Sequence, residues 1–135
     1  MRQTFTEIKV EGFHIDVYGH VNNARYLEYL ERGRWDFIEH YLDKAIIKEK
    51  QWGFIIVRID IRYRYPAFFD EVVIVDTATK KIGRVTVEMQ QYIRRKSDDK
   101  LLAEAVVEFV LMDMVRLRPL GIKNEVKTFL ESGEE

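Results

Sequence analysis

The sequence predicts an α+β fold in which a curved antiparallel sheet wraps around one long central helix. An apolar pattern with helical spacing runs from Asn22 or Asn23 to about Leu42. The strand-like segments that follow are separated by turns of hairpin length. The helix is apolar over so much of its circumference that other elements must surround it. One helix combined with consecutive antiparallel strands is an α+β arrangement.

Composition narrows the class of protein. A chain of 135 residues suits one domain with a sizeable core, so we expect a single domain over residues 1–135. With 47% hydrophobic and 33% charged residues, the chain is expected to fold as a globular protein. The formal net charge of −1 argues against a nucleic-acid or membrane-surface partner, because both classes of binder usually carry a basic excess.

The absence of cysteine excludes disulfides, thiolate metal sites and a cysteine nucleophile. It is compatible with a reducing cytoplasm, which is the expected location. The first ten residues are mixed polar and do not predict a signal peptide. No apolar run reaches the length of a membrane span.

The first half of the chain predicts a strand, a loop and the helix. Thr4 to Val10 alternate as a short strand, and residues 11–19 form a loop. Asn22 or Asn23 is a suitable helix N-cap. Tyr26, Tyr29 and Trp35 are expected mainly in the core, whereas Gly33 would mark a close approach by a strand. The remaining apolar positions at spacings of three and four are Leu27, Leu30, Phe37, Ile38 and Tyr41.

The second half predicts the sheet. Residues 43–53 are expected as a charged connection, followed by a strand with Val57, Ile59, Ile61, Tyr63 and Tyr65 on one face. Pro66 ends that strand or places it at an edge. Further strands are expected at 72–79, 85–95 and 101–114, with turns at 80–83 and 97–100. The strand at 101–114 is apolar on both faces from Ala105, which predicts cover by the helix and by a loop or second subunit. Residues 116–121 would close the sheet, and 122–130 would form a short amphipathic helix.

Elimination leaves one candidate for chemistry. The two serines lie in a turn and in the C-terminal tail, and no phosphate-binding glycine loop occurs. The three histidines lack zinc-site spacing, so neither a metal nor a cofactor is expected.

What remains is Asp16 with His20, in a loop that leads into a helix N-terminus. A buried carboxylate is a better base than an exposed one. The backbone N–H of Asn23, in the first turn, would polarise a carbonyl oxygen. The alternative is structural: Asp16 would satisfy loop amides, and His20 would support the core or the helix cap.

Residues 16–28 resemble the signature of hotdog-fold thioesterases. The run Asp-Val-Tyr-Gly-His-Val-Asn-Asn-Ala-Arg-Tyr-Leu-Glu is most similar to the 4-hydroxybenzoyl-CoA thioesterase-like branch, which includes bacterial long-chain acyl-CoA thioesterases. Residues 63–66 with Asp70, and residues 106–113 with Arg118 and Pro119, resemble later family segments. The resemblance implies a hotdog fold, hydrolysis of acyl-CoA, and a dimer or tetramer with sites at subunit interfaces.

The resemblance also implies residue roles. Asp16 falls at the catalytic carboxylate, His20 at the histidine of the plant motif, and the Asn23 amide at the group that polarises the thioester carbonyl. Tyr18 replaces the asparagine of the plant motif, which favours a mechanism centred on Asp16. The candidates for substrate binding are Tyr18, Tyr26, Lys80, Arg84 and Arg118. The alternatives are an acyl-carrier-protein thioesterase and a non-catalytic module that binds acyl groups.

Overall fold

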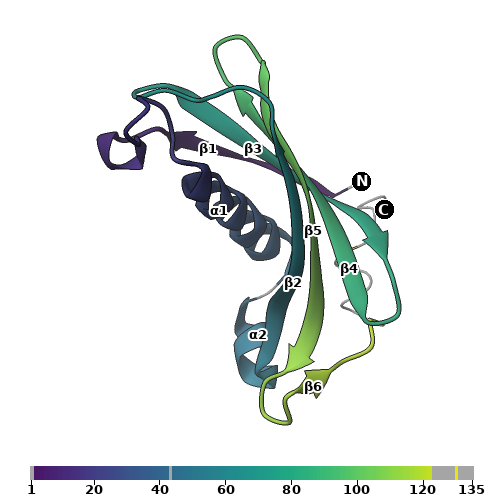
Figure 1. Ribbon diagram of the computed structural model, residues 1–135. Coiled ribbons are helices and arrows are strands. Elements are labelled where there is room, and N and C mark those ends of the chain that lie inside the picture. Colours follow the sequence, from purple (N-terminus) through teal and green to yellow (C-terminus); the bar gives the residue numbers. More distant parts are fainter. Residues whose placement is uncertain (1, 43, 123–129, 131–135) are drawn as a thin grey trace.

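The computed structural model describes residues 2–42, 44–122 and 130, which form a six-stranded sheet curled around one long helix (Figure 1). The elements in chain order are β1 (Gln3–Lys9), a short 3₁₀ turn η1 (Gly12–His14), α1 (Asn23–Tyr41), α2 (Lys44–Lys50), β2 (Trp52–Tyr63), β3 (Val72–Ile82), β4 (Thr86–Arg95), β5 (Leu101–Asp113) and β6 (Arg118–Pro119). The strand order is β1-β3-β4-β5-β2, with β6 paired to β5 and every pair antiparallel. The predicted hotdog fold is confirmed.

The core lies between α1 and the concave face of the sheet. Near the start of α1, Tyr26, Tyr29 and Leu30 pack with Val73 and Val107. Near its end, Phe37 and Ile38 pack in a second cluster with strand residues of β4 and β5. Burial of these apolar side chains is the main force that holds the helix inside the curl. Trp35 departs from the prediction, since 47% of its surface is exposed.

Gly33 marks a close approach, as predicted. A Cβ atom at this position would lie 2.6 Å from a methyl carbon of Val75 and 2.7 Å from the Thr77 hydroxyl oxygen. The neighbouring side chain of Gln91 is fully buried, and its amide donates to the Leu30 carbonyl oxygen and to Thr77. The missing side chain therefore lets α1 rest directly on β3 and β4.

The segment from residue 43 to 53 is not the plain connection that the sequence suggested. Residues 44–50 form α2, and β2 begins at Trp52. The register of β2 against β5 shifts between Ile56 and Arg58, so Ile56 pairs with Phe109 whereas Val57 leaves the inner face. The predicted alternation through Val57 is therefore wrong at that residue, of which 54% is exposed.

The other strands follow the prediction with shifted ends. β3 continues to Ile82, through the predicted turn at 80–83, and the chain reverses after it. Alternate residues of β5, including Ala105, Val107 and Phe109, are buried on its inner face, whereas Val106 and Val110 are half-buried on the outer face. The predicted helix at 122–130 lies mostly outside the described residues. None of the helices in the described part of the chain is long and apolar enough to cross a membrane.

Candidate active site

The loop between η1 and α1 folds back on itself around Asp16. The Asp16 N–H donates to the His20 carbonyl oxygen at 2.9 Å, and the Gly19 N–H donates to the Asp16 carbonyl oxygen at 3.0 Å. Gly19 has a φ of +88°, which a residue with a side chain adopts only with strain. The Asp16 side chain is half-buried, and its Oδ1 accepts the Tyr18 N–H at 2.9 Å. The turn thus fixes the carboxylate and leaves its second oxygen available.

Helix α1 begins beside this loop. Asn22 is the N-cap, and its side-chain oxygen accepts the Ala24 N–H at 2.9 Å. Its carbonyl oxygen accepts the Arg25 N–H at 2.9 Å. Among the described residues, the N–H of Asn23 has no hydrogen-bond partner. Such a free amide at the positive end of a helix favours a developing negative charge on a bound oxygen.

Asp16 and Asn23 lie on one cleft of about 490 Å³. Its walls are the Asp16 loop with the first turns of α1 and, distant from them in the sequence, the end of β2 with the residues after it. The lining residues are Asp16, Tyr18, His20, Val21, Asn22, Asn23, Tyr26, Tyr63, Arg64, Tyr65 and Pro66. In Figure 1 the loop and the start of α1 lie together at one end of the sheet. The cleft therefore brings a carboxylate and an unpaired amide to the same space.

Two tyrosines form the aromatic wall of the cleft. The buried Tyr26 hydroxyl accepts the Ala67 N–H at 2.9 Å, and the Tyr63 hydroxyl donates to the Asn23 carbonyl oxygen at 3.0 Å. Their rings meet edge to face with centroids 5.3 Å apart. Burial raises the pKa of Tyr26 and that of Tyr63 above the ordinary value. Both phenols are therefore neutral at pH 7, and they hold the helix start against the strand rather than exchanging protons.

His20 completes the rim of the cleft. Its ring stacks on that of Tyr18 with centroids 6.3 Å apart and meets the Phe68 ring edge to face at 6.2 Å. No hydrogen bond joins the side chains of His20 and Asp16 among the described residues. The Tyr18 N–H therefore holds the Asp16 carboxylate without help from the His20 ring, although the His20 carbonyl oxygen accepts the Asp16 N–H.

The cleft contains five of the predicted site residues. Asp16, Tyr18, His20, Asn23 and Tyr26 all line it. The basic candidates Lys80, Arg84 and Arg118 do not; they lie near the end of β3, in the following turn and in β6. The strand pairing puts Arg84 and Arg118 at the opposite end of the sheet, because Thr86 faces Val110 and Asp113 faces Arg118, whereas Tyr63 faces Ala103. Lys80 instead lines a separate pocket with Arg62 and Glu104.

Residues 63–66 line the cleft, although the sequence assigned them no site role. Tyr63 and Arg64 are brought to the Asp16 loop by contacts across the fold, since Val21 N–H donates to the Ala67 carbonyl oxygen. Arg64 supplies a positive charge, which an ion pair with Glu104 at 3.1 Å partly balances. The family-like run from Tyr63 to Pro66 was a sequence signal that pointed to this wall. Within the described ranges, no group of three His, Asp or Glu side chains is arranged to hold a metal ion.

Comparison with known proteins identifies the family of this chain. A family model described as "Thioesterase-like superfamily" matches residues 12–130. The chain belongs to this superfamily. One relative is the long-chain acyl-CoA thioesterase FadM of Escherichia coli K12. It is 34% identical to this chain over 126 residues, which cover 93% of this chain and 96% of FadM. The predicted family, and with it the prediction of an enzyme of the thioesterase class, are confirmed.

Solved structures place this thioesterase among hotdog proteins. The crystal structure of YbaW, described as a probable thioesterase from Escherichia coli, has a TM-score of 0.86 and 33% sequence identity, and the match covers 93% of this chain and 95% of that one. A mutant 4-hydroxybenzoyl-CoA thioesterase in complex with 4-hydroxybenzoyl-CoA has a TM-score of 0.87 at 20% identity, covering 97% of this chain and all of that one (100%). The second likeness supports the fold alone.

Proposed function

We propose that this thioesterase hydrolyses acyl-CoA thioesters to a free carboxylic acid and CoA. The observation that carries the proposal is the cleft in which the Asp16 carboxylate and the unpaired Asn23 amide lie together. The relative that is 34% identical over most of the chain is named a long-chain acyl-CoA thioesterase. We propose a cytoplasmic location, with which the cysteine-free sequence is compatible.

The proposed chemistry uses the two groups in turn. The Asn23 N–H donates to the thioester carbonyl oxygen, and the dipole of α1 stabilises the negative charge that develops there. Asp16 either removes a proton from an attacking water or attacks the carbonyl carbon to form an anhydride, which water then opens. In both routes the C–S bond breaks, the thiolate of CoA takes up a proton, and the acid carries oxygen from water or from the carboxylate. His20 would orient the water.

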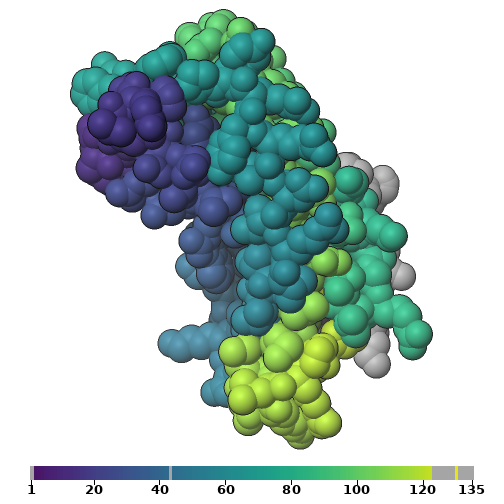
Figure 2. Space-filling view, in the orientation of Figure 1, coloured from purple at the N-terminus to yellow at the C-terminus, as the bar shows by residue number. Residues whose placement is uncertain are grey.

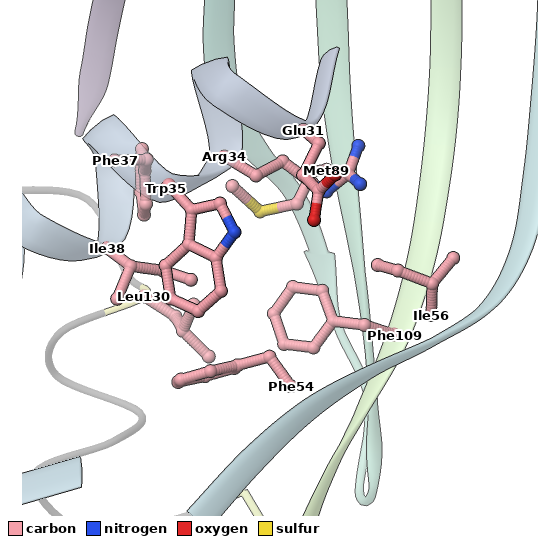
Figure 3. A pocket seen from close by; sticks show the side chains of 10 residues that line it. All are labelled: Glu31, Arg34, Trp35, Phe37, Ile38, Phe54, Ile56, Met89, Phe109 and Leu130. Atoms are coloured by element: carbon pink, nitrogen blue, oxygen red, sulfur yellow. The ribbon is translucent and has the colours of Figure 1, made fainter. Parts of the chain in front are cut away.

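The acyl tail has a suitable place further along the helix. A second cavity lies between α1 and the strands β2, β4 and β5, with Trp35, Phe54 and Phe109 around it (Figure 3). The volume of this cavity is about 60 Å³, which leaves room only for the end of an acyl chain. Ile38 lies fifteen residues after Asn23, which is about 22 Å along the helix axis. Leu27, of which 37% is exposed, and the half-buried Ile59 and Ile61 lie between the cleft and this cavity. We propose that the tail follows this apolar path, which favours long straight acyl chains.

The CoA head group would need the neighbouring subunit. Lys80, Arg84 and Arg118 do not line the cleft of their own chain. Lys80 lines a separate pocket with Arg62 and Glu104, and Arg84 and Arg118 lie at the far end of the sheet. We propose that they contact the CoA phosphates across an interface in a homodimer or homotetramer, the assembly that we propose. Within one chain, Arg64 is the basic residue that lines the cleft.

The variant Asp16→Asn tests the proposal. Asparagine keeps an oxygen that can accept the Tyr18 N–H, so the loop should hold, while the charge and the base are lost. We expect kcat for acyl-CoA hydrolysis to fall by at least about 100-fold, the scale of a lost general base. Thiol release would be followed with a panel of acyl-CoAs, and thermal unfolding would confirm that the variant is folded.

Asp60→Asn is the matched control, because Asp60 is an exposed carboxylate on β2 that does not line the cleft. Near-normal turnover by folded Asp16→Asn would rule out Asp16 as the catalytic group. Release of thiol from acyl-carrier protein but from none of the CoA esters would favour the carrier-protein alternative. Tight binding without thiol release from any ester would favour a non-catalytic module.

A further inference from the structure

His14 is a buried, titratable side chain outside the cleft. Its Nδ1 accepts the Glu11 backbone N–H at 3.0 Å and lies 2.8 Å from the Tyr29 hydroxyl oxygen. Only 9% of the residue is exposed. The ring thus closes the η1 turn on one side and contacts α1 on the other.

These contacts define the protonation state of the ring. A backbone N–H can only donate, so Nδ1 must carry the lone pair and the proton must lie on Nε2. A second proton on Nδ1 would point at the Glu11 N–H and break that bond. Burial lowers the pKa of His14, and the charge of Arg25 lowers it further, against the opposite influence of Glu11 and Glu28. The folded turn therefore favours the neutral imidazole.

The groups that face this ring come from three elements. Glu11 precedes η1, and α1 contributes Arg25, Glu28 and Tyr29. The cavity beside the ring, of about 290 Å³, is also lined by Glu31 and Arg32 of α1. From β1, the apolar Ile8 lines the same cavity. No carboxylate forms an ion pair with His14 within the described residues, so a charged ring would have no direct partner there.

His14 also holds the backbone of the candidate active site in place through a hydrogen bond. The His14 carbonyl oxygen accepts the N–H of Asn22, the N-cap of α1, at 2.9 Å. Asp16 follows His14 by two residues, and Ile15 forms a bridge with Val21 across the loop. A movement of this turn therefore changes the position of the carboxylate relative to the Asn23 amide.

We propose that His14 is a positioning residue: its neutral ring, fixed by the Glu11 N–H and Tyr29, aligns Asp16 with the Asn23 amide, and protonation of the ring releases the turn and slows catalysis. This inference rests on the proposed thioester hydrolysis. Since the folded pKa lies below the unfolded value of about 6.5, the turn is stabilised above that pH and loses this stability as the pH falls through the folded pKa.

The test compares pH profiles of kcat for wild type, His14→Asn and His14→Phe. Asparagine places an oxygen near the position of Nδ1 but does not titrate. We expect His14→Phe to lose about tenfold or more in kcat at pH 8, because small misplacements of reacting groups are costly. His14→Asn should stay within about threefold of wild type at pH 8. It should also lack the acid decline in kcat that we expect of wild type at a pH below the ordinary histidine pKa of about 6.5. KM should change little in either variant, since the His14 ring does not line the cleft.

Two controls separate His14 from its neighbours. Tyr29→Phe keeps the Glu11 bond and the imidazole, so the acid decline should persist. His20→Asn removes the histidine of the cleft, and the decline should persist there as well. A decline that His14→Asn leaves unchanged, or a folded His14→Phe with wild-type kcat, would overturn the inference. If wild type hydrolyses no thioester at any pH, the proposed function fails instead.

Discussion

At residue 33 the absence of a side chain sets the distance between α1 and the sheet. The hydroxyl of Thr77 and the amide of Gln91 occupy the space that a methyl group would need. Arg34, the next residue, donates to Gln91 Oε1 at 3.1 Å, so the buried amide is satisfied on both sides. This contact fixes the depth of the helix and, through it, the position of its N-terminus at the cleft.

Gly33→Ala should therefore destabilise the protein. Alanine gains about 1 kcal/mol in helix propensity, but it must displace Val75 and Thr77. We expect a net loss of about 1–3 kcal/mol in the free energy of unfolding, as for overpacked cores. Urea unfolding would measure it. Gly12→Ala is the control, because its added Cβ would lie 3.8 Å from its nearest neighbour, in ordinary contact. Equal stability of the two variants would contradict the close approach.

At the same scale, the sequence predicted the part of the site that is local in the chain. Asp16, His20 and Asn23 lie within eight residues, so a loop that enters a helix necessarily brings them together. Tyr63 and Arg64 reach the cleft only through the pairing of β2 and the curl of the sheet. No local pattern encodes that approach, which is why the second wall of the cleft had no predicted role.

Among the elements, α1 and the edge strand β2 meet mainly through side chains. The backbone of the helix lies closest to β1 and β3, whereas the ring contact of Tyr26 with Tyr63 joins it to β2 at the cleft (Figure 1). The alternation of β2 was predicted, but the register shift after Ile56 was not, because a bulge depends on the partner strand. Helix α2 was missed because seven residues are too few to show a clear helical period.

Ile56→Trp should shorten the preferred acyl chain. Ile56 lines the cavity of Figure 3, and an indole would fill it. We expect the ratio of kcat/KM for palmitoyl-CoA to that for octanoyl-CoA to fall by at least about tenfold, since each buried methylene contributes about 0.8 kcal/mol. Turnover of octanoyl-CoA should be nearly unchanged.

Ile55→Trp is the control for this change. Ile55 precedes Ile56 on β2 and is similarly exposed, but it pairs with Val110 and points to the other face. An unchanged chain-length ratio in Ile56→Trp would show that the acyl tail lies elsewhere. This result would leave the assignment of Asp16 untouched.

For the whole molecule, the open edge of the sheet is the dominant surface feature. Among the described strands β2 has a neighbour on one side only, and its apolar side chains include Ile55, Val57 and Tyr63, with 39%, 54% and 48% exposed. Figure 2 shows this part of the chain uncovered in the middle of the molecule. A long apolar edge strand that is left open promotes pairing with another chain.

The protein should therefore be at least a dimer at micromolar concentration, measured by sedimentation. Val57→Lys places a charge on the edge and should shift the protein toward monomers. Val85→Lys is the control, since Val85 is 41% exposed but lies between β3 and β4, away from the edge. A monomeric wild type would contradict the proposed assembly.

Tyr63 ends the edge strand, and its hydroxyl holds the first residue of α1. The outermost strand and the reacting groups are thus coupled through one phenol. Dilution that separates the subunits would relax this tether before any unfolding, so specific activity would decline with enzyme concentration while circular dichroism stayed constant.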